Sequence, residues 1–315
     1  MINKNILFLL LFSLVFTACN LSAHADPVIL PAISEPVPPE ATLQPTLTVT
    51  PYKEFTTTPT PIPSTSTPTQ TFTPTPTNTP LPSPTPTWAL VPAGKVVAPI
   101  LLYHHISKDS QSRYYVSPDN FRSEMESLRN WGYTTITPTF LVNVLINGGQ
   151  LPSRPIIISF DDGNLDVYQN AFPVMKELGY VGAVYIVANR LESDNFLHAD
   201  QLKELVAAGW EVGSHGMSHV DLTMNHSYLS REVLQSRLDL ETAVGVPVLT
   251  IAYPFGTVDG FVAQKSQEYG YHAGMGLGTS VTHTWGTLYY LSRREVHGDM
   301  DLTTFAGLLP WSGSP

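Results

Sequence analysis

Short apolar runs alternate with amphipathic segments along residues 93–315, and this alternation limits the fold more than any other feature. The apolar runs predict strands at Ala98–Tyr103, Pro155–Phe160, Val181–Val187, Glu211–Ser214, Val248–Tyr253, His272–Met275 and Thr287–Leu291. Helical spacing predicts helices at Asp119–Trp131, Phe140–Asn147, Asp166–Leu178, Ala199–Ala208, Ser227–Val244, Asp259–Tyr269 and Leu302–Leu309. Such alternation indicates a parallel α/β fold. A barrel explains the strand number and the chemistry at the strand ends, and a doubly wound open sheet is the competing layout.

Residues 1–18 have the pattern of an export signal. Lys4 precedes an apolar run from Ile6 to Ala18, which is shorter than the ~20 residues that span a bilayer but suits a signal segment. Small residues then precede Cys19, the only cysteine, as in bacterial lipoprotein signals, although Phe16 stands where leucine is usual. The alternative is cleavage near Ala23-His24-Ala25 and loss of Cys19. Either way we expect an exported protein without a disulfide, anchored to the membrane through a lipid on Cys19 or secreted.

Residues 19–92 are dominated by Pro, Thr and Ser, and they bury too little apolar surface to fold. We expect a disordered linker that forms an extended stalk of about 3.1 Å per residue. The remaining residues 93–315 form one sizeable domain, which we expect to be a monomer. The chain has a net charge of −10 and no basic stripe in its sequence, so nucleic acid is not an expected partner.

Two adjacent carboxylates, Asp161 and Asp162, end the apolar run Pro155–Phe160. A carboxylate at the end of a buried strand is costly unless it is paired or binds a metal. Another predicted strand leads into His215 and His219. Asp162 and these two imidazoles can bind one divalent ion, and Asp161 is then the base that takes a proton from a polarised water. Taken singly, Asp-Asp-Gly indicates a turn and His-x3-His indicates surface or polar packing. Their joint placement at two strand ends favours a site for metal-assisted hydrolysis.

Departure of an amine from an amide requires a proton donor. His104 and His105 lie at the end of the first predicted strand, where alternation directs the two side chains differently, so that only one serves. A purely structural histidine is the alternative, and His297 is the rival acid. A further loop, from Tyr253 to Gly256, predicts a sharp turn that aims the N–H of Phe255 at a developing oxyanion.

The four segments around His104, Asp161, His215 and Phe255 together resemble the polysaccharide deacetylase family, also called the NodB-homology domain or carbohydrate esterase family four. The resemblance covers about Val97 to Leu309. It implies a distorted (β/α)7 barrel and metal-dependent removal of acetyl from N-acetylglucosamine units of a cell-envelope or extracellular polysaccharide. It further implies a base, an oxyanion donor and three ligands of Zn2+, with Co2+, Ni2+ or Fe2+ as alternatives; these residues are Asp161 (base), the Phe255 amide (oxyanion donor) and Asp162, His215 and His219 (ligands).

Two departures from the family pattern are informative. Ala252 replaces the arginine that many members carry two places before the proline to hold the base aspartate, and the usual C-terminal Leu-x-His motif is unclear. The initial Tyr-His and the Tyr-Pro-aromatic-Gly without arginine resemble the branch that acts on poly-β-1,6-N-acetylglucosamine, and that branch implies His104 as the acid. Arg293 resembles a late-strand arginine of the same branch. We assign Tyr253 and Arg293 to substrate binding. Two alternatives remain for Arg293: it contacts the base aspartate, or it only forms a structural ion pair.

Other functions fit less well. A catalytically degenerate carbohydrate-binding module on the same barrel would explain the missing arginine, but the base and all three ligands are retained. An Fe(II) oxygenase also uses two histidines and a carboxylate, yet the extra aspartate does not fit it. A serine hydrolase would need a Gly-x-Ser-x-Gly turn, which the sequence lacks. Gly274–Gly278 lacks the strand–helix context of a dinucleotide site, and we interpret it as a loop.

Overall fold

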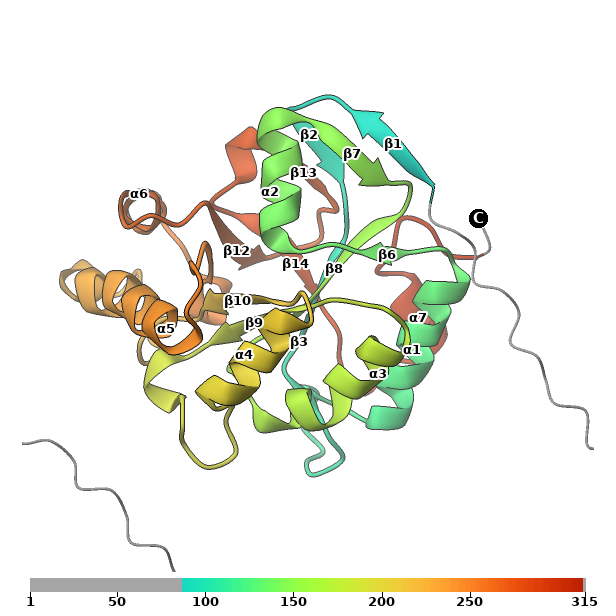
Figure 1. Cartoon of the computed structure of the whole chain (residues 1–315), viewed down its shortest axis with the longest axis horizontal. Coiled ribbons are helices and arrows are strands. Elements are labelled where there is room, and N and C mark those ends of the chain that lie inside the picture. The colour runs from blue at the N-terminus through green and yellow to red at the C-terminus, as the bar shows by residue number, and fades with distance from the viewer. Residues whose placement is uncertain (1–86, 314–315) are drawn as a thin grey trace, which may run out of the picture. The chain divides into compact units, whose positions relative to one another are not determined.

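Seven parallel strands close into a barrel at the centre of the structure, a computed structural model that describes residues 87–313 (Figure 1). The strands follow one another around the barrel in sequence order and are β3 (Ile100–Tyr103), β8 (Pro155–Phe160), β9 (Ala183–Ile186), β10 (Glu211–Ser214), β11 (Thr250–Ala252), β12 (Ala273–Leu277) and β14 (Leu291–Glu295). Pairing of β14 with β3, and of β3 with β8, closes the ring. The predicted barrel is therefore confirmed, and the open sheet is excluded. The predicted signal segment and Cys19 lie outside the described residues.

Helices surround the barrel, as a right-handed strand–helix–strand order requires (Figure 1). They are α1 (Pro118–Asn130), α2 (Pro138–Asn147), α3 (Phe172–Glu177), α4 (Ala199–Ala207), α5 (Ser236–Val244), α6 (Gly260–Glu268) and α7 (Leu302–Ala306). The first two begin in the same way: Ser117 or Thr137 accepts a hydrogen bond from a backbone N–H of the first turn, and a proline follows. A cap residue followed by proline satisfies orphan donors and fixes φ where the helix begins.

The two faces of the barrel strands belong to two separate apolar clusters. Residues such as Ile157, Tyr185 and Met275 fill the barrel interior together with side chains of α2. Their neighbours in sequence, such as Ile156 and Val184, pack outward against the surrounding helices. This two-residue alternation decides which side chains of each strand reach the barrel axis where the strand ends.

Short strands that the sequence patterns did not predict pair outside the barrel. They are β1 (Trp88–Val91) with β7 (Gly149–Pro152), β2 (Lys95–Val97) with β13 (Thr282–Thr284), β4 (His105–Ile106) with β5 (Tyr115–Val116), and β6 (Thr134–Thr135), which pairs with β8. Strand β1 starts at Trp88, so the folded domain begins before residue 93. The predicted boundary at residue 92 is therefore wrong by a few residues.

Several predicted elements differ from the structure. The last barrel strand is Leu291–Glu295 rather than Thr287–Leu291, because the aromatic run before it forms a turn whose tyrosine hydroxyls bind backbone carbonyls. The glycine-rich run Gly274–Gly278, predicted as a loop, lies largely in β12. A Cβ at Gly274 would collide with the hydroxyl end of the Tyr253 side chain, which explains glycine there. The predicted helix Ser227–Val244 consists of short 3-10 and π turns followed by α5.

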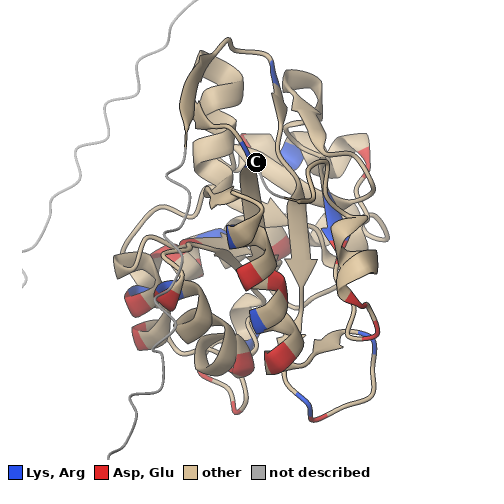
Figure 2. Cartoon of the chain, turned by 90° about the vertical axis from the view of Figure 1, so that its right-hand side faces the viewer, with Lys and Arg blue, Asp and Glu red and all other residues tan. Residues whose placement is uncertain are grey.

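Lys and Arg lie interspersed with Asp and Glu on the face that Figure 2 shows. Few of these charges lie in the upper part of that view, and more lie on the helices below. Within residues 87–313, none of the helices has the length and apolar character needed to cross a bilayer.

A buried acid on α1 makes stability depend on pH. Glu124 accepts a hydrogen bond from the Tyr103 hydroxyl at 2.9 Å, and burial raises its pKa to about 7. The folded state therefore holds a proton that the unfolded chain releases near pH 4.5, so stability falls as pH rises through this interval. We predict that the free energy of unfolding of the wild type falls by up to about 3 kcal/mol between pH 5 and 8, and that Glu124→Gln removes this fall. Urea unfolding at both pH values measures it; an equal pH dependence in both proteins would contradict the prediction.

Candidate metal and catalytic site

The Asp-Asp-Gly segment forms a tight turn at the end of β8. Ile157 and Ser159 belong to the inward-facing residues of this strand, and alternation places Asp161 next in the same series. The turn is made by two residues with left-handed backbone, Asp162 (φ 73°) and Gly163 (φ 77°). Asp161 is thus buried above the barrel interior, whereas Asp162 lies beside it and is partly exposed.

His215 and His219 follow β10, and each is fixed by its surroundings. The Nδ1 of His215 binds the carbonyl oxygen of Ala252 at 2.7 Å, which leaves Nε2 as the ligand atom. Buried Glu232 accepts hydrogen bonds from the N–H groups of Met217 and Ser218 and from the Ser218 hydroxyl, at 3.1, 2.8 and 2.7 Å. The loop between the two histidines is therefore held from below by one carboxylate.

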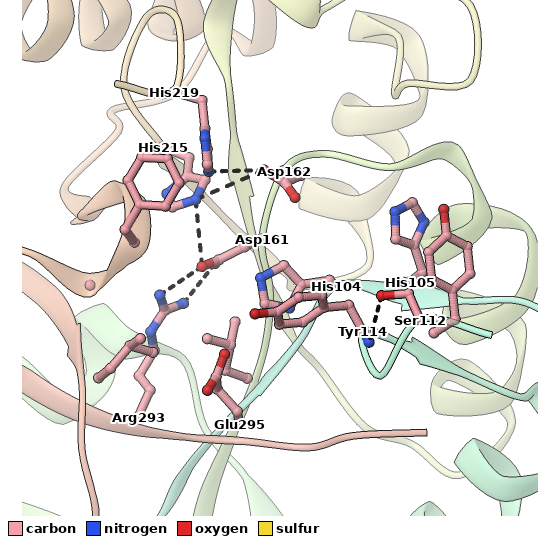
Figure 3. A pocket seen from close by; sticks show the side chains of 15 residues that line it. His104, His105, Ser112, Tyr114, Asp161, Asp162, His215, His219, Arg293 and Glu295 are labelled. Atoms are coloured by element: carbon pink, nitrogen blue, oxygen red, sulfur yellow. Dashed lines mark hydrogen bonds and ion pairs between the residues drawn. The ribbon is translucent and has the colours of Figure 1, made fainter. Parts of the chain in front are cut away.

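Asp162, His215 and His219 form a group that fits a divalent ion. One ligand atom from each lies within 4.8 Å of the others. Asp162 Oδ1 is 3.4 Å from His219 Nε2 and 4.0 Å from His215 Nε2 (Figure 3). Imidazole nitrogens and a carboxylate oxygen are ligand types that zinc binds, so this donor set fits a divalent ion. The three predicted ligands therefore come together in the structure.

Asp161 is paired with Arg293 of β14. The guanidinium Nη1 and Nη2 donate to the two carboxylate oxygens at 2.6 and 2.7 Å, and both side chains are buried (Figure 3). Burial alone would raise the pKa of Asp161, but the charges of Arg293 and then His215 outweigh it and lower the pKa to about 2. Arg293 thus contacts the aspartate predicted to be the base, which answers the alternative left open by the sequence.

His104 lies in the same cavity as the two aspartates, between Asp161 and Tyr114 (Figure 3). Burial lowers its pKa, and the charges of Asp161 and Asp162 oppose this effect. His105 also lines this cavity, but its Nδ1 binds Asp166 at 2.6 Å. The rival His297 is 2.8 Å from Arg113 and lines a neighbouring cavity without Asp161 or Asp162. Geometry therefore favours His104 over His297 as the residue near the reacting atoms.

The loop after β11 places Phe255 in the cavity but not Tyr253. Phe255 has a left-handed backbone (φ 60°), and its ring lies 4.7 Å from that of His219. Tyr253 is fully buried among the residues between the barrel and the helices. The prediction that Tyr253 binds substrate is therefore wrong: alternation along β11 directs Ala252 inward and Tyr253 outward.

One cavity of about 410 Å3 at the carboxyl ends of the barrel strands is lined by the expected base and its arginine partner, the three expected ligands, His104 and Phe255. Besides the two aspartates and His104, the walls include Tyr114, Leu277 and Glu295. Parallel strands point their carboxyl ends to one face, where loops from different strands meet. Sequence patterns missed Glu232, Asn164 and Asp166, which hold the loops of this face. Asn164 and Asp166 at least lie close to the Asp-Asp-Gly motif, whereas Glu232 is far from any motif in the sequence.

Comparison with known proteins gives one consistent family. A model of the polysaccharide deacetylase family matches residues 148–274. YxkH of Bacillus subtilis, named a polysaccharide deacetylase only provisionally, is 26% identical over 67% of this chain and 75% of its own. The poly-β-1,6-N-acetyl-D-glucosamine N-deacetylase of Staphylococcus aureus is 24% identical over 63% of this chain and 73% of its own. A solved polysaccharide deacetylase from Bacillus cereus has a TM-score of 0.61 and 28% identity, covering 68% of this chain and 69% of its own.

We predict that Glu232 maintains metal affinity by holding the histidine loop. Glu232→Gln replaces one acceptor oxygen by a donor, so the loop loses part of its support, and divalent-metal affinity should fall about 10–100-fold. Competition with a chromophoric chelator measures this affinity. Glu124→Gln, a substitution of another buried glutamate away from the cavity, is the matched control. Equal metal affinity in Glu232→Gln and the wild type would refute this role.

We predict that Arg293 sets the acidic limit of activity. In Arg293→Met the buried Asp161 loses its positive partner, so its pKa rises and it is deprotonated only at higher pH. The acid limb of the kcat/KM profile should therefore move to higher pH, and kcat/KM at pH 7 should fall at least about 100-fold. Arg294→Met is the control, because Arg294 binds the carbonyl oxygens of Thr279 and Leu308 instead. An unmoved acid limb would be inconsistent with this pairing.

Proposed function

Because the chain belongs to the polysaccharide deacetylase family, whose members are hydrolases, we propose that it removes acetyl groups from N-acetylglucosamine units of a polysaccharide. The observation that carries this proposal is the ionised Asp161, paired with Arg293 beside the metal-type group of Asp162, His215 and His219. A base and a metal site in one cavity are the groups that metal-assisted hydrolysis of an amide uses.

Each residue of the site has its own role in the proposed reaction. A divalent ion held by Asp162, His215 and His219 would supply Lewis-acid chemistry, and zinc suits two imidazoles and one carboxylate. Asp161 accepts a proton from the attacking water, while Arg293 keeps its carboxylate ionised and oriented. The N–H of Phe255 stabilises the oxyanion. His104 donates a proton to the departing nitrogen, which leaves as an amine, and the acetyl group leaves as acetate.

The alternative of a degenerate carbohydrate-binding module rested on Ala252, which stands where an arginine is usual. Arg293 reaches the same aspartate from β14 instead, in a bidentate arrangement. This contact removes the main reason for the degenerate interpretation, and it supports a catalytic protein.

The substrate proposal is supported by the Staphylococcus aureus relative, which is named for poly-β-1,6-N-acetyl-D-glucosamine. We propose a β-linked N-acetylglucosamine polymer outside the cell as the substrate. We further propose that the enzyme is exported and anchored through Cys19, and this rests on the sequence of the segment before residue 87.

The purified mature chain, loaded with zinc, should release acetate from N-acetylglucosamine oligomers. Asp161→Asn should abolish turnover while the protein keeps its metal, because Asp161 is the base and not a ligand. His104→Ala should lower kcat about 100-fold or more, whereas His297→Ala should retain most activity. Acetate assay and elemental analysis of each variant are the measurements. Loss of metal in Asp161→Asn, or a greater loss of turnover in His297→Ala, would overturn the assigned roles.

A further inference from the structure

A second cavity, of about 610 Å3, adjoins the catalytic cavity on the side of Asp162. The two cavities share three lining residues, which are His105, Tyr115 and Asp162. Its volume lies within the range of small-molecule sites. A polymer whose reacting unit occupies the first cavity must place an adjacent unit somewhere along this surface, and the shared wall makes the second cavity a continuous path for it on the side of Asp162.

His105 is fixed on the wall between the cavities. Its Nδ1 binds Asp166 Oδ2 at 2.6 Å, and its ring stacks on Tyr115 at 3.9 Å with an angle of 10°. Among the described residues, Nε2 of His105 has no hydrogen-bonding partner. A ring with a fixed plane, a fixed partner on one nitrogen and a free second nitrogen is preorganised to bind a hydroxyl or an amide.

Asn164, Asp166 and Asn170 hold the backbone segment that carries His104 and His105. Asn164 donates to the carbonyl oxygen of His104 at 3.1 Å, and Asp166 Oδ1 accepts from the N–H of Ile106 at 3.1 Å. Asn170 donates to the carbonyl oxygen of Ile106 at 2.7 Å. Consecutive residues of an extended segment point to opposite sides, so His104 lies toward the two aspartates (Figure 3), while His105 also lines the second cavity.

The opposite wall of the second cavity is joined by hydrogen bonds to the segment that follows Asp162. The N–H of Leu165 donates to the carbonyl oxygen of Asn195, and that of Leu197 to Gly163, at 2.9 and 2.8 Å. Arg190 lies over the Phe196 ring at 5.3 Å, and its Nη1 is 3.5 Å from Asp162 Oδ1. The cavity thus combines polar groups with an aromatic ring on walls fixed to the Asp-Asp-Gly turn, which suits a sugar ring.

We propose that His105, held by Asp166, binds the sugar unit next to the one that loses its acetyl group, within the second cavity. The proposal rests on the proposed function and adds a specificity-determining residue to it. Adjacent histidines then serve adjacent units of the polymer: His104 serves the acetamide that is cleaved, and His105 contacts its neighbour.

The test compares long and short substrates in His105→Gln. An activated aryl acetate needs only the catalytic cavity, whereas an N-acetylglucosamine pentamer also fills the second one. We expect kcat/KM for the pentamer to fall about tenfold, mainly through KM, as the loss of one hydrogen bond to substrate predicts. The fall for the aryl acetate should be at least about fivefold smaller. An equal fall for both substrates, or no fall for the pentamer, would overturn the proposal.

The chain offers a matched control. His226 also binds an aspartate, Asp259, at 2.8 Å and stacks on an aromatic ring, that of Phe261, but it lines neither cavity. His226→Gln should leave the ratio of kcat/KM for the N-acetylglucosamine pentamer to kcat/KM for the aryl acetate at the wild-type value. Calorimetric binding of a fully deacetylated glucosamine pentamer, which is not turned over, provides a second measurement: we expect about tenfold weaker binding to His105→Gln. If wild-type protein binds the glucosamine pentamer but removes no acetyl group from the N-acetylglucosamine pentamer, the proposed function alone is refuted. Equal binding by His105→Gln and the wild type would refute this inference alone.

Discussion

The buried ion pair between Arg293 and Asp161 connects the last barrel strand to the strand that ends in both aspartates. Both charges are removed from water, so each depends on the other: removal of one partner from such a pair costs about 3–5 kcal/mol. The same pair keeps the pKa of Asp161 low in a site where burial alone would protonate it. Ionisation of the expected base therefore depends on one contact, which also joins the ends of β14 and β8 across β3.

Of the five non-glycine residues with left-handed φ among residues 87–313, three lie at the site. Asp162, His219 and Phe255 are non-glycine residues with left-handed φ values of 73°, 58° and 60°, and all three line the catalytic cavity. Such conformations cost of order 1–3 kcal/mol each and persist only when the surroundings impose them. Here Glu232 holds the loop before His219, and Gly163 follows Asp162 in the same turn. The fold thus uses packing elsewhere to keep three side chains directed at one point.

Strand alternation shows which parts of the structure the sequence could predict. Strands β8 and β10 match their predicted bounds, because their apolar runs end at charged or glycine-rich turns. Alternation also separates His104 from His105 and should have excluded Tyr253, since Ala252 faces inward. The last strand was misplaced because Arg293 and Arg294 look unlike a buried strand. A side chain whose burial depends on a distant partner carries no local signal.

The position of Arg293 indicates what this site requires. A family arginine near the start of the Pro-aromatic-Gly loop would lie on β11, where this chain has Ala252 instead. Ala252 still contributes, because its carbonyl oxygen orients His215. The guanidinium comes from β14, which is separated from β8 by four strands in one direction around the barrel but only by β3 in the other. A closed barrel places every strand end around the same point, so a charge can be supplied from any strand whose inward residue lies at the right height. The site therefore requires a positive charge beside Asp161. It does not require that this charge come from one particular position in the sequence.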